Sequence, residues 1–339
     1  MPSQPYSSPR GSTAQTPRAV RATRPPLTRP RDFFPFWSAT LETLARTPPD
    51  PRLGVAVTSP EGARITPVRF RSLGGRAVQG FLITPGDRRT DAPPASGRPL
   101  VVSTHGYNSQ SNPVLEARHT AASGADLFCF DVRGFGLSRP GCPTDAGGWV
   151  LTGLADPESS ILRGAVCDFV RAAEVAVQLE AGRGGIAFHG RSFGGALALM
   201  AQAVSQCATY VAAAVPTLGW TEGRLRLAKA GSTREINDHL ALHPADRASF
   251  LRSLAYFDTL LFADRVRCPS LVGVGAFDEV VPPATVYAIT NHMVPAPEVL
   301  ELPVSHTDRM DERRWVEFDR RWTAEVALIA GGRISPRGR

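Results

Sequence analysis

The sequence predicts an α/β fold with a mostly parallel central sheet and helices on both faces, and three observations predict it. Short apolar stretches alternate with helical patterns over most of the chain, which is typical of parallel strands connected by helices. One of these strands runs into Gly190-Arg191-Ser192-Phe193-Gly194 and then directly into Ala/Leu-rich sequence, which favours a helix. With 339 residues, 42% of them hydrophobic, the chain can bury the core that such a sheet requires.

The first 30 residues differ from the rest of the chain. They are rich in Pro, Ser, Thr and Arg and contain no acidic residue, so they cannot bury enough apolar surface to fold alone. We predict a disordered extension over 1–30 and one α/β domain over 31–339. The helical spacing of Phe33, Phe36 and Trp37 predicts a helix where the domain begins.

The remaining elements follow in order. Alternating residues around Gly74-Gly75 predict a hairpin. Further strands are predicted at 100–103, 126–131, 210–215, 271–274 and 299–302, and helices at 161–179 and 315–329. The interval from about 220 to 262 is polar and helical without a strand pattern. We expect it to form a small helical cap over the carboxyl ends of the strands, where ligands bind in such sheets.

The motif around Ser192 is the strongest chemical signal. A strand, Gly-x-Ser-x-Gly and a helix form the nucleophile elbow of the α/β-hydrolase fold. The glycines let strand and helix pass closely while the serine occupies the tight turn. The alternative is a glycine-rich loop with an incidental serine. If the elbow forms, the backbone N–H of Phe193 is a donor for an oxyanion.

A serine nucleophile requires a base and an orienting acid. In this fold they follow the serine in the order acid then histidine, each after a later strand. Asp278 follows the strand at 271–274, and His306 follows the strand at 299–302. Glu279 is the alternative acid, because a shift of one residue would exchange the two carboxylates. The other six histidines lack this order and context.

The loop His105-Gly106-Tyr107-Asn108 follows the strand at 100–103 and resembles the oxyanion loop of esterases. We therefore expect the Tyr107 N–H to be the second oxyanion donor. Tyr107, Phe135, Phe193 and Pro216 are the residues that we expect to line the substrate pocket.

Composition excludes several other classes of protein. The five cysteines are odd in number and scattered, which argues against disulfides or a zinc site and favours the cytoplasm. No apolar run is long enough to span a membrane. Much of the net charge of +7 comes from arginines near the start of the chain. No aromatic platform accompanies them, so we expect no nucleic-acid partner.

With these residues identified, the sequence resembles the acetylxylan esterase/cephalosporin-C deacetylase family, carbohydrate esterase family seven, from about residue 30 to 322. The matching segments include Arg31-Asp32-Phe33, His105-Gly106-Tyr107-Asn108, Asp131-Val132-Arg133-Gly134, Gly147-Gly148-Trp149, Tyr256-Phe257-Asp258 and Asn291-His292. The resemblance implies a serine esterase without metal or organic cofactor that removes acetyl groups from sugar esters and related small-molecule esters. It also implies a ring-like homohexamer.

Three positions depart from the family pattern. Phe135 and Phe193 stand where the family has glutamines, and Thr307 follows His306 in place of glutamate. The two phenylalanines make the surroundings of the serine more apolar, which favours an aryl, terpenoid or natural-product ester over acetylated xylan. Our functional hypothesis is a short-chain, chiefly acetyl, serine carboxylesterase. The alternatives are a peptidase, thioesterase or acyltransferase with the same triad, or a non-catalytic binding protein on this fold.

Overall fold

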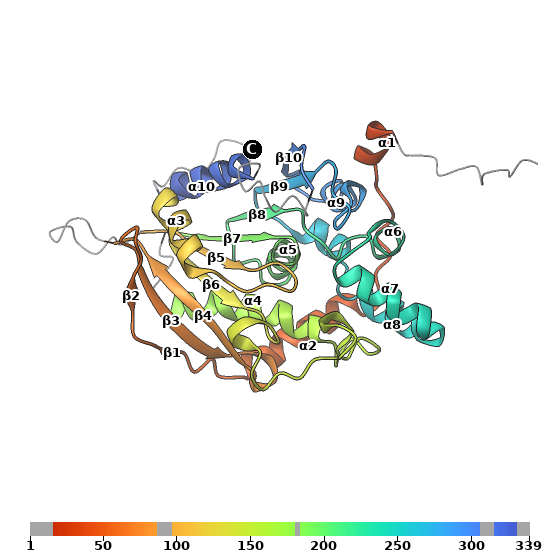
Figure 1. Ribbon diagram of the computed structural model, residues 1–339, viewed down its shortest axis with the longest axis horizontal. Helices are drawn as coiled ribbons and strands as arrows, with labels where there is room; N and C mark the ends of the chain where they lie inside the picture. Colours follow the sequence, from red (N-terminus) through yellow and green to blue (C-terminus); the bar gives the residue numbers. More distant parts are fainter. Residues whose placement is uncertain (1–15, 87–96, 180–183, 306–314, 331–339) are drawn as a thin grey trace, which may run out of the picture.

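The computed structural model describes residues 16–86, 97–179, 184–305 and 315–330 (Figure 1). Within these residues, ten strands form one sheet in the order β1-β3-β4-β6-β5-β7-β8-β9-β10, with β2 paired to β3. The strands are β1 (Arg52–Leu53), β2 (Val57–Thr58), β3 (Arg64–Arg71), β4 (Ala77–Thr84), β5 (Leu100–Thr104), β6 (Asp126–Asp131), β7 (Ile186–Arg191), β8 (Tyr210–Ala214), β9 (Ser270–Gly275) and β10 (Glu298–Leu302).

The helices in the described residues are α1 (Pro17–Arg21), α2 (Phe33–Ala45), α3 (Pro113–Ser123), α4 (Ile161–Gln178), α5 (Phe193–Ser205), α6 (Thr221–Leu227), α7 (Ser232–Leu242), α8 (Arg247–Leu254), α9 (Pro283–Thr290) and α10 (Val316–Ala330). Two short 3₁₀ helices also matter for the site, η3 (Trp149–Leu151) and η5 (Thr259–Arg265).

The sheet has an antiparallel part and a parallel part. Strands β1 to β4 are antiparallel to their neighbours, and β4 joins β6 in the same way. From β6 through β5, β7, β8 and β9 to β10, every pairing is parallel. The predicted hairpin is β3 and β4, and Gly74 adopts φ 71° in the turn between them. The predicted mostly parallel α/β sheet is therefore confirmed.

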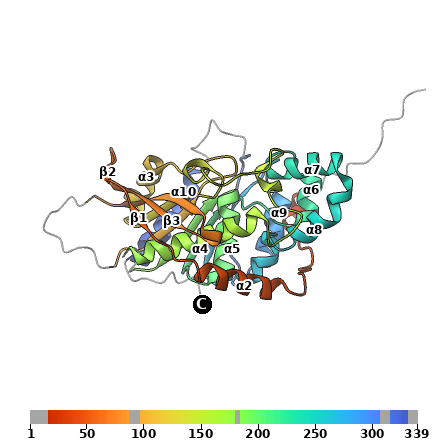
Figure 2. The same cartoon turned by 90° about the horizontal axis from the view of Figure 1, so that it is seen from below.

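Helices cover both faces of the sheet, as the view from below shows (Figure 2). Helices α3 and α10 pack together on one face, and α2, α4 and α5 lie on the other. Every residue of β5, β6, β8 and β9 is buried. This explains their continuous apolar sequences, because a strand covered on both sides has no polar face. Phe169 of α4 packs between Phe130 of β6 and Phe188 of β7, with ring centroids 5.5 and 4.8 Å away.

The interval that we predicted as a helical cap contains α6, α7 and α8 and ends within η5. These three helices lie together at one end of the molecule in both views (Figures 1 and 2). It is the end toward which the parallel strands run, because β8 leads directly into α6. Side chains that follow the parallel strands therefore face the cap.

Residues 16–30 correct part of our prediction for the start of the chain. We expected disorder over 1–30, but 16–30 are ordered and contact the domain, whereas 1–15 lie outside the described residues. Arg21 forms a bidentate pair with Glu301 at 2.7 and 2.9 Å, and the Arg29 Nε donates to the Leu261 carbonyl at 2.8 Å. Arginines of the predicted disordered extension thus bind specific acceptors, so composition alone misjudged residues 16–30. We call residues 16–30 the strap.

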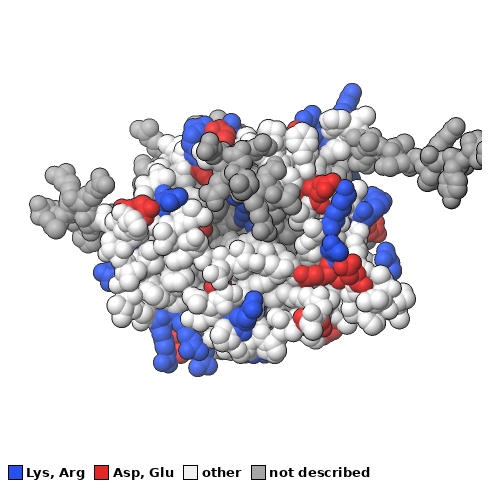
Figure 3. All heavy atoms as spheres, in the orientation of Figure 1, with Lys and Arg blue, Asp and Glu red and all other residues white. Residues whose placement is uncertain are grey.

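Charges of both signs are distributed over the face shown in Figure 3, with blue and red atoms side by side near the cap. The predicted cap interval contributes to two ion pairs, Lys229–Glu279 at 2.6 Å and Arg234–Asp238 at 3.3 Å. Within the ranges that the structure describes, no helix has both the length and the hydrophobicity needed to cross a bilayer.

Candidate active site

Ser192 occupies the turn between β7 and α5, as the motif predicted. Its backbone has φ 57° and ψ −115°, a region that costs a non-glycine residue about 1–3 kcal/mol. The Ser192 N–H donates to the Ala214 carbonyl at 2.8 Å, and the Thr217 N–H donates to the Ser192 carbonyl at 3.2 Å. These bonds to the end of β8 and the residues after it hold the serine in its strained conformation.

The glycines at 190 and 194 are required by close packing. A Cβ at Gly190 would lie 2.2 Å from the Gly194 carbonyl carbon, and a Cβ at Gly194 would lie 2.4 Å from the Thr104 carbonyl oxygen. No side chain fits at such distances, because backbone atoms cannot move aside. Strand β7, helix α5 and the end of β5 therefore meet at the serine, which confirms the strand–turn–helix geometry of the elbow.

Phe193 is the first residue of α5. The N–H groups in the first turn of a helix have no partner inside the helix, and they lie at the positive end of its dipole. The Phe193 N–H is thus available beside the serine hydroxyl for a developing negative charge. Pro216 is buried between Ala214 and Thr217, the two residues whose backbones bond Ser192, so it belongs to the same turn.

Tyr107 lies on the loop that follows β5, next to the strand that carries Ser192. The loop is fixed by His105, whose Nε2 accepts the Val132 N–H at 3.1 Å and whose Nδ1 lies 2.7 Å from the Gly106 carbonyl oxygen. One nitrogen accepts and the other donates, which is the pattern of a neutral imidazole. Burial lowers the pKa of His105, in agreement with a neutral ring. His105 is therefore committed to holding the loop.

Four aromatic rings pack together around the two expected oxyanion donors. Tyr107 packs against Phe193 with centroids 5.7 Å apart and against Phe135 with centroids 5.6 Å apart. Trp149 stacks on Phe135 at 4.9 Å and meets Phe193 edge-on at 5.2 Å. We call Tyr107, Phe135, Trp149 and Phe193 the aromatic cluster. The structure thus brings the expected pocket residues Tyr107, Phe135 and Phe193 together, beside Ser192.

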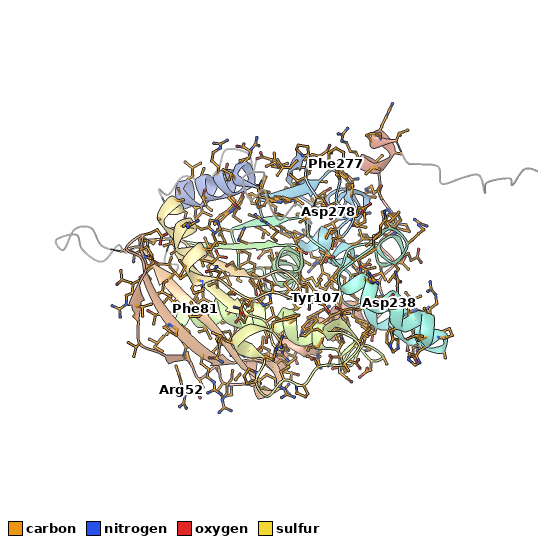
Figure 4. All side chains as sticks on the ribbon, viewed as in Figure 1. Arg52, Phe81, Tyr107, Asp238, Phe277 and Asp278 are labelled. Atoms are coloured by element: carbon orange, nitrogen blue, oxygen red, sulfur yellow. The ribbon has the colours of Figure 1, made fainter. Side chains whose placement is uncertain are left out.

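Asp278 lies in the turn after β9 with its side chain buried, 3% exposed. Its Oδ1 accepts the N–H groups of Val280 at 2.9 Å and Val281 at 2.8 Å. Glu279, the alternative acid, is 65% exposed and pairs with Lys229. The two candidate acids thus have different surroundings: the Asp278 carboxylate lies inside the protein, and the Glu279 carboxylate faces solvent. Tyr107 and Asp278 both lie at the end of the sheet that faces the cap (Figure 4).

His306, the expected base, lies outside the described residues. The chain leading to it is described as far as Ser305, and Val304 accepts a hydrogen bond from the Phe277 N–H at 3.2 Å. The segment that enters position 306 therefore passes beside the turn that carries Asp278.

The six described histidines have other surroundings. His189 stacks with Trp322, and His119 meets the same ring edge-on. His239 bonds Asp246 in the cap, and His292 bonds the carbonyl of Pro25 in the strap. His243 lies against His239, and His105 holds the Tyr107 loop. In the part of the chain that the structure describes, we find no group of three or more His, Cys, Asp or Glu side chains that could hold a metal ion.

Two residues of this region were not predicted as site residues. From the sequence, Trp149 was recognised only as part of a segment that matches the esterase family, although its ring completes the aromatic cluster. Glu235, on cap helix α7, accepts a hydrogen bond from the Tyr107 hydroxyl at 2.5 Å. A single acid in a polar helix carries no sequence signal for such a contact. Beside it, a cavity of 690 Å³ opens between α7 and residues 145–151.

Comparison with known proteins now identifies the family. The profile of the family described as Acetyl xylan esterase (AXE1) matches residues 18–313. The chain belongs to this family. The resemblance inferred from the motifs, the α/β-hydrolase fold and the assignment as a serine-type carboxylic ester hydrolase are thereby confirmed.

Individual relatives agree with this assignment. The chain is 27% identical to the acetyl esterase Axe7A of Xylanibacter ruminicola over 172 residues, which are 50% of this chain and 38% of that protein. The match therefore spans well under half of that relative.

Solved structures show the same fold. An acetyl xylan esterase from Paenibacillus sp. R4 superposes with a TM-score of 0.80 at 24% identity, covering 90% of this chain and 99% of that one. Acetyl xylan esterase 1 from Thermoanaerobacterium sp. JW/SL YS485 superposes with a TM-score of 0.77 at 23% identity, covering 92% and 99%.

Proposed function

We propose that this esterase hydrolyses short-chain, chiefly acetyl, esters of a sugar or another small alcohol, with Ser192 as its nucleophile. The observation that carries the proposal is the strained turn at Ser192, which holds a hydroxyl beside the first N–H of α5. Strain of this kind persists where the surrounding structure maintains it, and it is concentrated at active sites. The acetyl esterases among the relatives support the acyl group.

The reaction proceeds through an acyl-serine. Ser192 Oγ attacks the ester carbonyl while His306 accepts its proton, and Asp278 orients the imidazole and stabilises the imidazolium. The N–H groups of Tyr107 and Phe193 donate to the oxyanion of the tetrahedral intermediate, and each such donor contributes about 3–4 kcal/mol. His306 then protonates the leaving alcohol, and a water molecule activated by the same histidine releases the acid.

Burial supports Asp278 as the acid of the triad. A carboxylate that stabilises an imidazolium acts most strongly where water does not screen it, and the Asp278 side chain is buried. Its Oδ1 accepts two backbone N–H groups, which hold the carboxylate in a fixed orientation in the turn after β9. Glu279 is exposed and paired with Lys229, which disfavours it.

The aromatic cluster supports a short acyl group and an apolar pocket. Phe135, Trp149 and Phe193 are each at most 5% exposed, so they fill the space beside the oxyanion donors. Rings packed in this way leave room for a methyl group more easily than for a long chain. Polar hydroxyls of the substrate have few partners among these rings, so the polar contacts of a sugar fall to the cap.

The decisive experiment is an ester panel with a fixed leaving group. We expect p-nitrophenyl acetate to be the best substrate, with kcat/KM falling at least 10-fold by the butyrate, and Ser192→Ala to abolish turnover. Efficient hydrolysis of the octanoate ester would contradict the short-chain proposal, and efficient hydrolysis of the amide p-nitroacetanilide would favour the peptidase alternative. Acetylated xylo-oligosaccharides and aryl acetates would then separate a sugar alcohol from a natural-product alcohol.

We also propose a cytoplasmic location and, from the family, a homohexamer. The five cysteines are all free, which is usual in a reducing compartment. Cell fractionation of the tagged protein tests the location, and light scattering of the purified protein tests the assembly.

A further inference from the structure

The hydroxyl of Tyr107 is held by two partners that come from different parts of the chain. It donates to Glu235 Oε2 at 2.5 Å and accepts the N–H of Val150 at 2.9 Å. The ring of Tyr107 is enclosed by Phe135, Trp149 and Phe193. The side chain is therefore fixed along its sides by packing and at its tip by hydrogen bonds.

The protonation state of Tyr107 keeps this arrangement in place. Burial raises the pKa of Tyr107, and the hydrogen bond to the Glu235 carboxylate raises it further. The phenol thus stays protonated and remains a donor at any pH at which an esterase works. A hydrogen bond to a charged acceptor is shorter and stronger than a neutral one.

The chain also makes room for this carboxylate. Gly148 has φ 153°, and a Cβ there would lie 2.1 Å from Glu235 Oε2 and 2.5 Å from its Cδ. Any other residue at 148 would displace the Glu235 side chain. Gly148 directly precedes Trp149 of the aromatic cluster, so one short segment supplies the space for Glu235, a ring against Tyr107 and the Val150 N–H.

The position of Tyr107 matters because its backbone N–H is the second donor in the proposed function. Asn108, the next residue, has φ 53°, so the loop turns sharply at this point. On the other side, His105 holds the loop to the end of β6. The hydrogen bond from Tyr107 to Glu235 links this loop to the cap.

We propose that Glu235 is a positioning residue of the active site: from the cap, it fixes the Tyr107 side chain and thereby the backbone N–H that stabilises the oxyanion. The inference rests on the proposed function, in which Tyr107 supplies that donor. Glu235 does not contact the reacting atoms. Glu235 acts through the Tyr107 phenol, so its removal should weaken stabilisation of the transition state more than binding of the substrate.

The test is a double-mutant cycle between positions 107 and 235, measured with p-nitrophenyl acetate. Glu235→Ala and Tyr107→Phe each remove the same hydrogen bond, and Tyr107→Phe keeps the ring packing. We expect each to lower kcat about 10-fold or more, with KM changed less than 3-fold. The double variant should be no slower than the worse single variant. Glu235→Gln keeps an acceptor and should recover most of kcat.

A matched control and a second measurement make the result specific. Glu222→Ala removes an exposed carboxylate from the neighbouring cap helix α6 and should leave kcat unchanged. Trifluoroacetophenone reports on the oxyanion directly. Ser192 Oγ adds to its ketone carbon, the hydroxyl proton passes to the base, and the carbonyl oxygen becomes an oxyanion. Its inhibition constant should rise in Glu235→Ala by about the factor that kcat/KM falls.

The outcomes separate this inference from the proposed function. If Ser192→Ala retains turnover, the proposed function fails. If Ser192→Ala is inactive but Glu235→Ala and Tyr107→Phe match the wild type, only the role of Glu235 fails. Additive losses in the double variant, or a rise in KM without a fall in kcat, would also overturn it. Should Glu235→Ala not fold, Tyr107→Phe and Glu235→Gln still decide the question.

Discussion

The Asp168 carboxylate and the Arg133 guanidinium form a bidentate ion pair inside the protein, with Arg133 Nη2 2.6 Å from Oδ1 and Nε 2.9 Å from Oδ2. Asp168 is fully buried on α4, and Arg133 follows β6. The carbonyl of Arg133 accepts the indole N–H of Trp149 at 2.9 Å. The ion pair thus anchors the loop that supports the aromatic cluster.

Breaking this pair should destabilise the protein strongly. Asp168→Ala leaves a buried guanidinium without its carboxylate, and we expect a loss of about 3–5 kcal/mol in the free energy of unfolding. Urea denaturation followed by tryptophan fluorescence measures it. The double variant Asp168→Leu/Arg133→Met removes both charges and should recover part of the loss. A loss below about 1 kcal/mol in Asp168→Ala would show that the pair contributes little.

Gly164 should not tolerate alanine, although alanine favours helices by about 1 kcal/mol over glycine. A Cβ at Gly164 would lie 2.1 Å from Arg133 Nη1 and 2.3 Å from its Cζ, so Gly164→Ala must displace the buried guanidinium. We expect a lower melting temperature in calorimetry. In an Arg133→Met background, the same substitution should cost much less. A gain in stability in the wild-type background would refute the clash.

Replacing Ser192 with glycine should stabilise the fold while it abolishes activity. Glycine adopts φ 57° without strain, so Ser192→Gly should raise the free energy of unfolding by about 1 kcal/mol. Ser192→Ala is the control, because it removes the hydroxyl but keeps the strained backbone. Equal free energies of unfolding for the two variants would show that the backbone conformation at position 192 carries little strain energy.

The two neighbouring carboxylates at 278 and 279 should differ sharply in function. Asp278→Asn removes the charge that orients the base, and we expect kcat to fall by about 10⁴-fold at neutral pH. Glu279→Gln changes an exposed, ion-paired side chain and should stay within about 2-fold. The comparison is made in kcat for p-nitrophenyl acetate. A large effect of Glu279→Gln together with an active Asp278→Asn would exchange their assignments.

His189 should make the protein less stable in acid. Burial lowers its pKa well below the ordinary value, and the charges of His119 and Arg191 lower it further. The unfolded chain therefore binds a proton below about pH 6.5 that the folded protein rejects. The contribution of neutral His189 to the free energy of unfolding is fully present above about pH 6.5. It is lost as the pH falls, by up to about 2 kcal/mol at pH 5.

His189→Phe keeps the stacking on Trp322 and removes this titration. The fall in unfolding free energy between pH 7 and 5 should be smaller in the variant by about that amount. Urea denaturation at both pH values gives the comparison. His119 has a raised pKa: burial lowers it, but Glu116 and Asp319 outweigh burial. The contribution of His119 to the free energy of unfolding is therefore fully present below about pH 6.5 and is lost as the pH rises through its raised pKa. If the unfolding free energy fell by the same amount between pH 7 and 5 in His189→Phe as in the wild type, the prediction for His189 would be contradicted.

The sequence predicted those features that depend on neighbouring residues. The strand, turn and helix around Ser192 are local, and so is the position of Asp278 after β9. Glu235 could not be predicted, because its partner Tyr107 lies 128 positions away and hydrogen bonds of that kind leave no spacing in the sequence. The strap was missed for the same reason: its proline and arginine content is typical of disorder, but the acceptors for its arginines are supplied by residues 261–301.

The strap also bears on the order of events during synthesis. Arg21 reaches Glu301, and the Asn291 amide bonds the carbonyls of Arg21 and Thr23, across separations of 280, 270 and 268 residues. The strap therefore leaves the ribosome long before these partners are synthesised. Its docking therefore follows the synthesis of α9 and β10.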